Sequence, residues 1–267
     1  MKNYDIPVVI LCGGKGTRIK EMTESIPKPL IEIGGKPIVW HIMKIYSSFG
    51  FNNFILCLGY KSHKIKEFFL NYELLNSDIT VGLGSKNNIT VHNSHDERDW
   101  KVTLAFTGEE NMTGSRIKQI EKYVPGNSFM MTYGDGVSNV NIKQLLDFHK
   151  SHGKIGTVTG VRPASRFGEL LLAGDEVESF SEKPQTSTGR INGGFFVLNK
   201  EVFNYVSEDE NCIFERDPLE NLAKDKQLMM HQHDGFWQCM DTLRDMQYLE
   251  KLWEEKETPW RVWEGQG

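Results

Sequence analysis

Residues 7–18 read PVVILCGGKGTR, an apolar run followed at once by glycines, a threonine and an arginine. The run 7–11 has the length and composition of a buried strand, and glycines let a backbone approach a ligand closely. The loop lacks the Lys-Ser/Thr ending of a Walker loop, and Ile19 stands where a dinucleotide-binding loop has its third glycine. The stretch therefore predicts a phosphate-binding loop after a central strand, but of neither common kind.

Strand-length apolar runs alternate with helical patterns along the first 162 residues. The predicted strands and helices are, in chain order, strand 7–11, helix 37–49, strand 54–59, helix 63–72, strand 101–108, helix 115–124, strand 129–136, helix 142–152 and strand 154–162. Such alternation is typical of βαβ units, and it predicts an α/β fold with a mostly parallel, mixed sheet flanked by helices.

The rest of the chain adds smaller elements to this sheet. Residues 168–184 predict a hairpin around Gly174-Asp175, which would form a small β appendage. A further strand is expected at 193–200, a helix at 214–225, and an amphipathic C-terminal helix at 243–257. The polar stretch 73–100 is expected to be either a mobile insertion or an arm that contacts a partner.

Composition limits the possible function classes. The 267 residues carry a net charge of -5, with 39% hydrophobic and 25% charged residues, as in an ordinary globular protein. Nucleic-acid binders usually present a basic face, so nucleic acid is not an expected partner. No signal peptide or membrane-length apolar run is evident, and the four widely spaced cysteines suggest free thiols. We therefore expect a cytoplasmic protein without membrane attachment.

Charged residues stand where strands are predicted to end. Asp135 in YGDG and Asp241 in GFWQCMDT are a candidate Mg²⁺ pair, because Mg²⁺ takes one or two carboxylates together with substrate phosphates. The alternative for a lone Asp between glycines is a turn residue. Arg18 and Lys28 add two cations near the glycines, and they are either phosphate ligands or solvated surface charges.

Several motifs, in order, resemble the sugar-1-phosphate nucleotidyltransferases, also called sugar-nucleotide pyrophosphorylases. They span residues 8–245 and read LCGGKGTR…PKPLIEIGGKPI, YGDGV, RFGEL, FSEKP, INGGFFVLN and GFWQCMDTLRD. Within that family the chain most resembles the members that use CTP and glucose 1-phosphate to make CDP-glucose. The resemblance implies a Rossmann-like nucleotidyltransferase fold in one domain, 1–267. About 1–140 would bind the nucleotide and about 141–245 the sugar phosphate, with a C-terminal helix and tail at 243–267.

The resemblance also implies a reaction and residue roles. The phosphate oxygen of a hexose 1-phosphate would attack the α-phosphorus of CTP in line, and pyrophosphate would leave. Asp135 and Asp241 would hold Mg²⁺, Arg18 would contact the triphosphate, and Lys28 would neutralise the reacting phosphates. The other residues implied for the nucleotide are Leu11, Cys12, Gly13, Gly14, Lys15, Gly16, Thr17, Arg116 and Gly134, with Lys15 contributing only backbone. Those implied for the sugar phosphate are Gly168, Glu182, Lys183, Asn192 and Gly193.

Alternatives remain within and outside this class. The same fold could use UTP, dTTP or another phosphorylated substrate, or it could be a catalytically silent subunit that senses nucleotides. The complete set of Arg18, Lys28, Asp135, Lys183 and Asp241 favours an enzyme. A dinucleotide-dependent dehydrogenase is disfavoured by the missing third glycine. The family resemblance further implies a homo-oligomer, either a hexamer or a trimer-based assembly.

Overall fold

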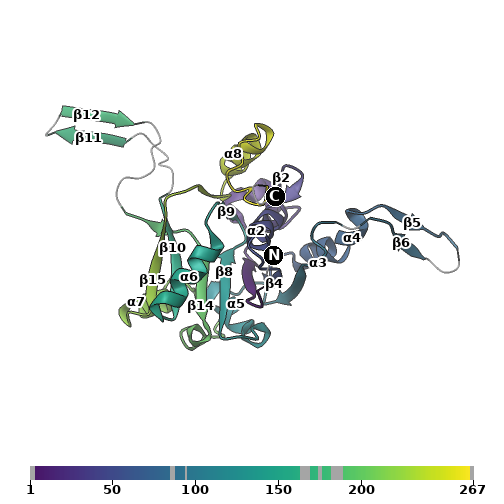
Figure 1. Ribbon diagram of the computed structural model, residues 1–267, viewed down its shortest axis with the longest axis horizontal. Coiled ribbons are helices and arrows are strands. Elements are labelled where there is room, and N and C mark those ends of the chain that lie inside the picture. Colours follow the sequence, from purple (N-terminus) through teal and green to yellow (C-terminus); the bar gives the residue numbers. More distant parts are fainter. Residues whose placement is uncertain are drawn as a thin grey trace.

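The computed structural model describes residues 4–84, 88–93, 95–162, 169–173, 176–181 and 189–264. Its centre is an eight-stranded sheet in the order β13-β10-β14-β8-β1-β4-β7, with β15 also paired to β10 (Figure 1). The strands are β1 (Val8–Cys12), β4 (Asn53–Leu58), β7 (Lys101–Phe106), β8 (Ser128–Tyr133), β10 (Gly156–Val161), β13 (Ile191–Asn192), β14 (Phe196–Asn199) and β15 (Leu228–His233).

Most pairings in this sheet are parallel, as predicted. Strand β1 runs parallel to both β4 and β8, β4 is parallel to β7, and β10 is parallel to β15. Strand β14 is antiparallel to both β8 and β10, and β13 is antiparallel to β10. The predicted mixed, mostly parallel α/β sheet is therefore confirmed. The chain leaves β1 for β4 on one side and later returns as β8 on the other, so a crevice forms at the carboxyl end of β1.

The helices include all six that were predicted, although the one expected at 115–124 ends at Gln119 and two short helices were not predicted. They are α1 (Lys20–Thr23), α2 (Ile38–Ser47), α3 (Ser62–Leu70), α4 (Tyr72–Leu75), α5 (Thr113–Gln119), α6 (Ile142–His152), α7 (Asp217–Lys224) and α8 (Leu243–Glu254). Short 3-10 turns are η1 (Thr17–Ile19), η2 (Lys28–Leu30), η3 (Glu121–Tyr123) and η4 (Lys200–Asn204). No helix in the described ranges is both long and apolar enough to cross a membrane.

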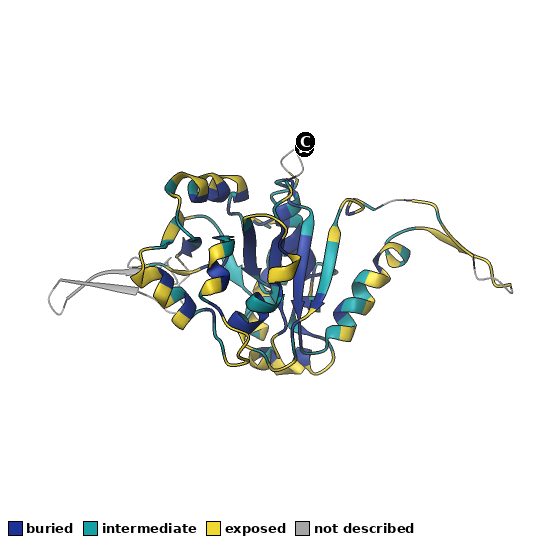
Figure 2. Ribbon diagram, turned by 90° about the horizontal axis from the view of Figure 1, so that it is seen from below, coloured by how far each residue is buried: buried dark blue, intermediate teal, exposed yellow. Residues whose placement is uncertain are grey.

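Alternating side chains of the sheet fill two cores, one on each face, and Figure 2 shows the buried strands between their covering helices. In β1, Val8 and Ile10 pack with residues of α2, α6, α8 and the C-terminal tail, whereas Val9 packs with α5, η4 and α7. Because successive strand residues point to opposite faces, a run that is apolar at every position indicates burial on both sides. This explains why 7–11 reads as continuous apolar sequence.

Four two-stranded ribbons stand outside the central sheet. They are β2 (Glu32–Ile33) with β3 (Lys36–Pro37), β5 (Ile79–Val81) with β6 (Ile89–Val91), β9 (Gly136–Ser138) with β16 (Trp237–Cys239), and β11 (Glu169–Ala173) with β12 (Glu176–Ser181). The β11–β12 ribbon confirms the predicted hairpin. The β5–β6 ribbon lies in the polar stretch 73–100 and extends away from the body as an arm (Figure 1).

Aromatic residues from the C-terminal part of the chain pack against His41, a buried histidine of α2. The ring of His41 packs against Trp253, Trp260 and Trp263, with centroid separations of 5.2, 6.2 and 6.2 Å. His41 Nε2 lies 2.8 Å from the carbonyl oxygen of Ile33, which can only accept, so this nitrogen carries the proton. Its Nδ1 then accepts the indole N–H of Trp260 at 3.4 Å. The neutral ring is thus satisfied on both sides.

Acid should weaken this attachment. Burial lowers the pKa of His41 to about 4, below the 6.5 of an ordinary histidine. Between these values the unfolded chain binds a proton that the folded chain does not. The free energy of unfolding should therefore fall by about 3 kcal/mol as the pH drops from 6.5 to 4. Urea titrations at several pH values measure this free energy. In a His41→Gln variant it should fall by about 3 kcal/mol less than in the parent over the same pH range.

The matched control for this prediction is His63→Gln on the exposed face of α3. It should leave the pH slope of the parent unchanged. Equal slopes in the parent and in His41→Gln would show that His41 does not govern the acid sensitivity.

Candidate active site

The loop after β1 forms one wall of a cavity of about 560 Å³ at the carboxyl ends of β1 and β8. Gly16 has φ +62°, a left-handed conformation that glycine adopts without strain, and the turn η1 begins directly after it. Gly13 is required for a different reason, since a Cβ there would lie 2.2 Å from Arg116 Nη1. Gly13 therefore lets the loop lie close to a buried guanidinium, and Gly16 provides the turn that leads into η1.

Arg116, from α5, is almost fully buried beneath this loop. Its Nη1 donates to the carbonyl oxygens of Leu58 and Gly108 at 3.2 and 2.6 Å and to Thr107 Oγ1 at 3.0 Å. Its Nη2 donates to the carbonyl oxygen of Gly13 at 3.1 Å. The end of β4 and the loops that follow β1 and β7 are thus bonded to one side chain. Desolvation lowers the pKa of Arg116, but the group stays charged because its ordinary pKa is so high.

Two carboxylates meet across the cavity from the glycines. Asp135 directly precedes β9, and Asp241 is the second residue after β16. The ribbon pairs Gly136 with Cys239, and the amide of Met240 donates to the carbonyl oxygen of Asp135 at 2.8 Å. This pairing brings together two residues that are 106 positions apart in the chain (241 − 135).

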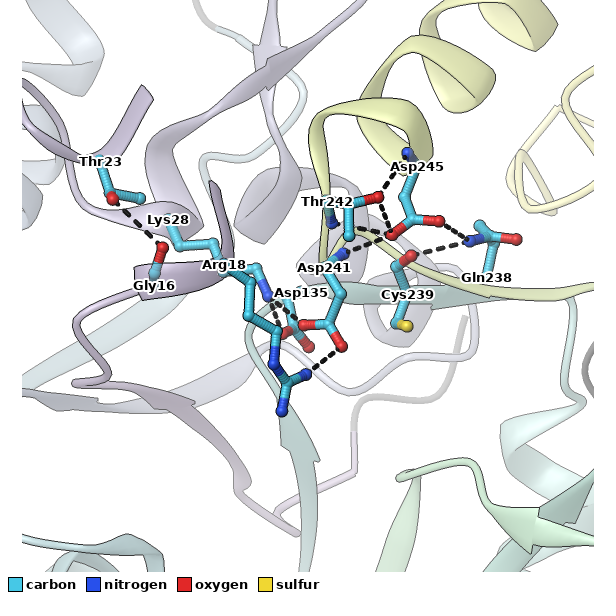
Figure 3. A network of polar contacts seen from close by, with 10 residues as sticks. All are labelled: Gly16, Arg18, Thr23, Lys28, Asp135, Gln238, Cys239, Asp241, Thr242 and Asp245. Carbon is cyan, nitrogen blue, oxygen red and sulfur yellow. Dashed lines mark hydrogen bonds and ion pairs between the residues drawn. The ribbon is translucent and has the colours of Figure 1, made fainter. Parts of the chain in front are cut away.

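Lys28 bridges the two carboxylates, as Figure 3 shows. Its Nζ lies 2.6 Å from Asp135 Oδ2 and 2.7 Å from Asp241 Oδ1. Arg18 Nη1 contacts the other oxygen of Asp241 at 2.5 Å. The side chain of Lys28 is only 12% exposed, whereas that of Arg18 is 71% exposed. Lys28 is therefore an internal part of the site, and Arg18 lies at its open edge.

The charges in this network support one another. Burial disfavours the ammonium of Lys28, but Asp135 and Asp241 outweigh it and raise its pKa. Burial likewise disfavours the Asp241 carboxylate, yet Lys28 and Arg18 lower its pKa. Burial raises the pKa of the Cys12 thiol, which also lines the cavity. That thiol stays protonated at neutral pH and is a poor nucleophile.

The start of α8 orients Asp241. Thr242 is the N-cap of this helix and forms a capping box with Asp245. Asp245 Oδ2 accepts the backbone amides of Asp241 and Thr242 at 3.1 and 2.8 Å. Gln238 Nε2 donates to the other oxygen of Asp245 at 3.3 Å. The Asp241 carboxylate is thereby presented by a rigid helix end and by the β9–β16 ribbon (Figure 3).

The donor set suits a hard divalent cation that is brought by a ligand. Asp135 and Asp241 each lie within 2.7 Å of one shared ammonium, so together they already surround a point of positive charge. The described residues contain no group of three or more His, Cys, Asp or Glu side chains that could enclose a metal by themselves. Two carboxylates plus ligand phosphates are the usual environment of Mg²⁺. The residues present therefore fit Mg²⁺ held jointly with a nucleotide.

The cavity brings together most residues that the sequence implied for the nucleotide. Those on its lining are Leu11, Cys12, Gly13, Gly14, Gly16, Thr17, Arg18, Lys28, Arg116, Gly134, Asp135 and Asp241. The backbone and side chain of Lys15 do not line it, and the Lys15 ammonium pairs with Glu110 at 2.7 Å. Gly168, Glu182 and Lys183 lie outside the described residues. Asn192 is in β13, and Gly193 follows it.

Sequence reasoning missed part of the lining. Asn111, Met112 and Thr113 enter the cavity from the start of α5, and Tyr133 enters from the end of β8. The position of Tyr133, as the first residue of YGDG at a strand end, was a usable signal. The segment 111–113 offered none, because it has no special composition or spacing and reaches the site only through packing.

Arg116 should stabilise the loop rather than serve only as a ligand. Arg116→Met would leave several buried acceptors without donors, so we expect a loss of about 3 kcal/mol or more in the free energy of unfolding. Lys143→Met, exposed on α6, is the control and should cost little. Chemical denaturation measures both variants. Unchanged stability of Arg116→Met together with lost nucleotide binding would instead make Arg116 a ligand alone.

Comparison with known proteins agrees with this geometry. A family model described as nucleotidyl transferase matches residues 7–254. The glucose-1-phosphate cytidylyltransferase of Salmonella typhimurium (strain LT2) is 50% identical over 257 residues, which cover 96% of this chain and 99% of the relative. The probable glucose-1-phosphate cytidylyltransferase of Bacillus subtilis (strain 168) is 46% identical over 255 residues, with the same coverage.

Solved structures share the architecture. HddC from Yersinia pseudotuberculosis has a TM-score of 0.64 at 25% identity, covering 93% of this chain and 99% of that one. A UDP-glucose pyrophosphorylase complexed with UDP-glucose has a TM-score of 0.67 at 16% identity, covering 94% and 99%, which supports the fold alone. The chain belongs to the nucleotidyl transferase family, in which it groups with the glucose-1-phosphate cytidylyltransferases.

Proposed function

We propose that the chain transfers the cytidylyl group of CTP to α-D-glucose 1-phosphate, forming CDP-glucose and pyrophosphate. The main support for this reaction is the Lys28–Asp135–Asp241 network, which lines a cavity of about 560 Å³ together with the glycines of the loop after β1. The 50% identity to a glucose-1-phosphate cytidylyltransferase supports the choice of substrates. An oxygen of the sugar phosphate bonds to the α-phosphorus as the bond to the departing pyrophosphate breaks.

The residues of the site are suited to alignment and charge neutralisation. A phosphate oxygen is already ionised near pH 7, so the reaction needs no side-chain nucleophile. Lys28 would contact the reacting phosphates, and Arg18, at the open edge, would contact the phosphates that leave. Asp135 and Asp241 would hold Mg²⁺, which neutralises phosphate charge when bound. The backbone of 11–14 and of Gly16 and Thr17 would follow the nucleotide, with Gly134 close to it.

The sugar phosphate would bind next to the cavity, against a wall that includes Asn192, which contacts the cavity-lining Tyr133. We propose Asn192 and Gly193, with Gly168, Glu182 and Lys183, as its contacts. This divides one domain into a nucleotide half, about 1–140, and a sugar-phosphate half, about 141–245. The backbone hydrogen bond between Gly193 and Thr159, 2.9 Å long, supports a fixed position for that wall.

Association and location are also proposed. Apolar side chains are exposed along the arm and its base, among them Leu70 (77%), Leu75 (74%) and Leu83 (92%). Such a surface favours contact with a second copy of the chain, and hence a homo-oligomer. All four cysteines are unpaired, which supports a cytoplasmic location. The net charge of -5 favours small anionic substrates bound at local cations over nucleic acid.

A substrate panel tests the proposed function. Pyrophosphate release is followed for four nucleoside triphosphates against several hexose 1-phosphates, with Mg²⁺ present. CTP with glucose 1-phosphate should give the highest kcat/KM, and Asp241→Asn should lower it about 100-fold or more. Asp234→Asn is the control. It removes a carboxylate that pairs with Arg190 and not with Lys28, and it should retain activity. A preference for UTP or dTTP, or no turnover at all, would refute the assignment.

The Lys28 ammonium should compete with a metal for the two carboxylates. Lys28→Met should therefore bind free Mn²⁺, a Mg²⁺ substitute, about tenfold more tightly than the parent while losing turnover, because a nearby positive charge is removed. Electron paramagnetic resonance of free Mn²⁺ measures the affinity without any reaction. Lys15→Met, whose ammonium pairs with Glu110, is the control. Identical Mn²⁺ affinities in all three proteins would contradict this arrangement.

A further inference from the structure

Glu215 joins two walls of the cavity without belonging to the charged network. It lies just before α7, and both of its carboxylate oxygens have partners. Oε1 accepts the hydroxyl of Tyr133 at 2.8 Å, and Oε2 accepts the hydroxyl of Thr113 at 2.6 Å. Tyr133 and Thr113 both line the cavity, one from the end of β8 and the other from the start of α5.

The segment that carries Glu215 is itself fixed to α5. The carbonyl oxygens of Glu210 and Cys212 accept the amides of Met112 and Gly114, each at 2.8 Å. The amide of Phe214 donates to Thr113 Oγ1 at 2.9 Å, so the single proton of that hydroxyl is free to go to Glu215. Glu215 is therefore held in place from its own backbone and from the nucleotide side of the cavity.

The hydrogen bonds of Glu215 continue through Tyr133 to Asn192 in β13. The hydroxyl proton of Tyr133 goes to Glu215, since a carboxylate can only accept. The Tyr133 oxygen must then accept from its second partner, Asn192 Nδ2, at 3.0 Å. Asn192 Oδ1 in turn accepts the amide of Gly194 at 2.9 Å. These two contacts determine which way the Asn192 amide faces, because its nitrogen and oxygen cannot be exchanged.

The proton arrangement is stable at neutral pH. Burial, reinforced by the negative charge of Glu215, raises the pKa of Tyr133 and keeps its hydroxyl protonated. Asn192 itself is exposed, and its described contacts use one of its two amide hydrogens. An exposed amide held in one orientation is suited to recognising a hydroxyl-bearing ligand.

We propose that Glu215 is a positioning residue, which acts through Tyr133 to orient the Asn192 amide toward the hexose of the sugar phosphate. This inference rests on the proposed function, in which Asn192 contacts the sugar. Thr113 fixes the other oxygen of Glu215 to the nucleotide wall, so the sugar side is positioned relative to the nucleotide. Glu215 is not among the residues that line the cavity, in contrast to Lys28 and Asp241.

Kinetics of Glu215→Gln and Tyr133→Phe test the inference. Each variant removes one link, so each should raise KM for glucose 1-phosphate about fivefold to tenfold while KM for CTP changes less than about twofold. The double variant should be no worse than Glu215→Gln alone, because both changes break one chain. Tyr205→Phe is the matched control, since the Tyr205 hydroxyl donates to exposed Asp225 at 2.8 Å. It should change neither KM.

A spectroscopic readout separates this inference from the proposed function. The side-chain amide signal of Asn192, assigned by its loss in Asn192→Asp, should shift in Glu215→Gln and Tyr133→Phe but not in Tyr205→Phe, whichever substrates the enzyme uses. Equal rises in both KM values, additive effects in the double variant or an unmoved Asn192 signal would overturn the inference. An inactive parent protein with a shifted signal would instead refute only the proposed function.

Discussion

The ammonium of Lys28 between Asp135 and Asp241 is the contact on which the site depends. Each of the three comes from a different part of the chain, and each would be a costly charge if it lost its partners at this depth. The β9–β16 ribbon and the capped start of α8 bring the two carboxylates to the same ammonium. Backbone pairing and helix capping, which usually only stabilise a fold, here also determine the spacing of the two carboxylates.

A second buried cation, Arg116, organises the opposite wall. Its hydrogen bonds go to carbonyl oxygens at the ends of strands, so the glycine loop rests on a charged group instead of an apolar one. Partial positive charge beneath the loop also favours an anionic ligand above it. The two walls therefore use cations differently, since Lys28 pairs with two carboxylates that line the cavity, whereas Arg116 bonds to the backbone of the fold.

Much of this arrangement could be predicted from sequence, and the limits have physical causes. A continuous apolar run such as 7–11 indicates a strand that is buried on both faces of a sheet. The strand predicted at 129–136 then places Asp135 at the carboxyl edge of that sheet. The nearness of Asp241 depends on a ribbon of three-residue strands, which is too short to give a periodic pattern. Residues 111–113 reach the cavity, and Glu215 reaches two residues that line it, through contacts between segments distant in the chain. Arg116 was implied for the nucleotide by the family resemblance alone, which does not reveal that its guanidinium bonds to the backbone.

The pairing of β9 with β16 also bears on how the protein is made. Asp135 is synthesised at about the midpoint of the chain, but its partner strand and the cap of α8 emerge more than one hundred residues later (241 − 135 = 106). A nascent chain can build β1, β4 and β8 on the ribosome and still lack a complete charged site. Closing so long a loop makes this contact one of the slower steps in folding. Ligands that need both carboxylates thus bind only the finished fold, and they add their binding energy to its stability.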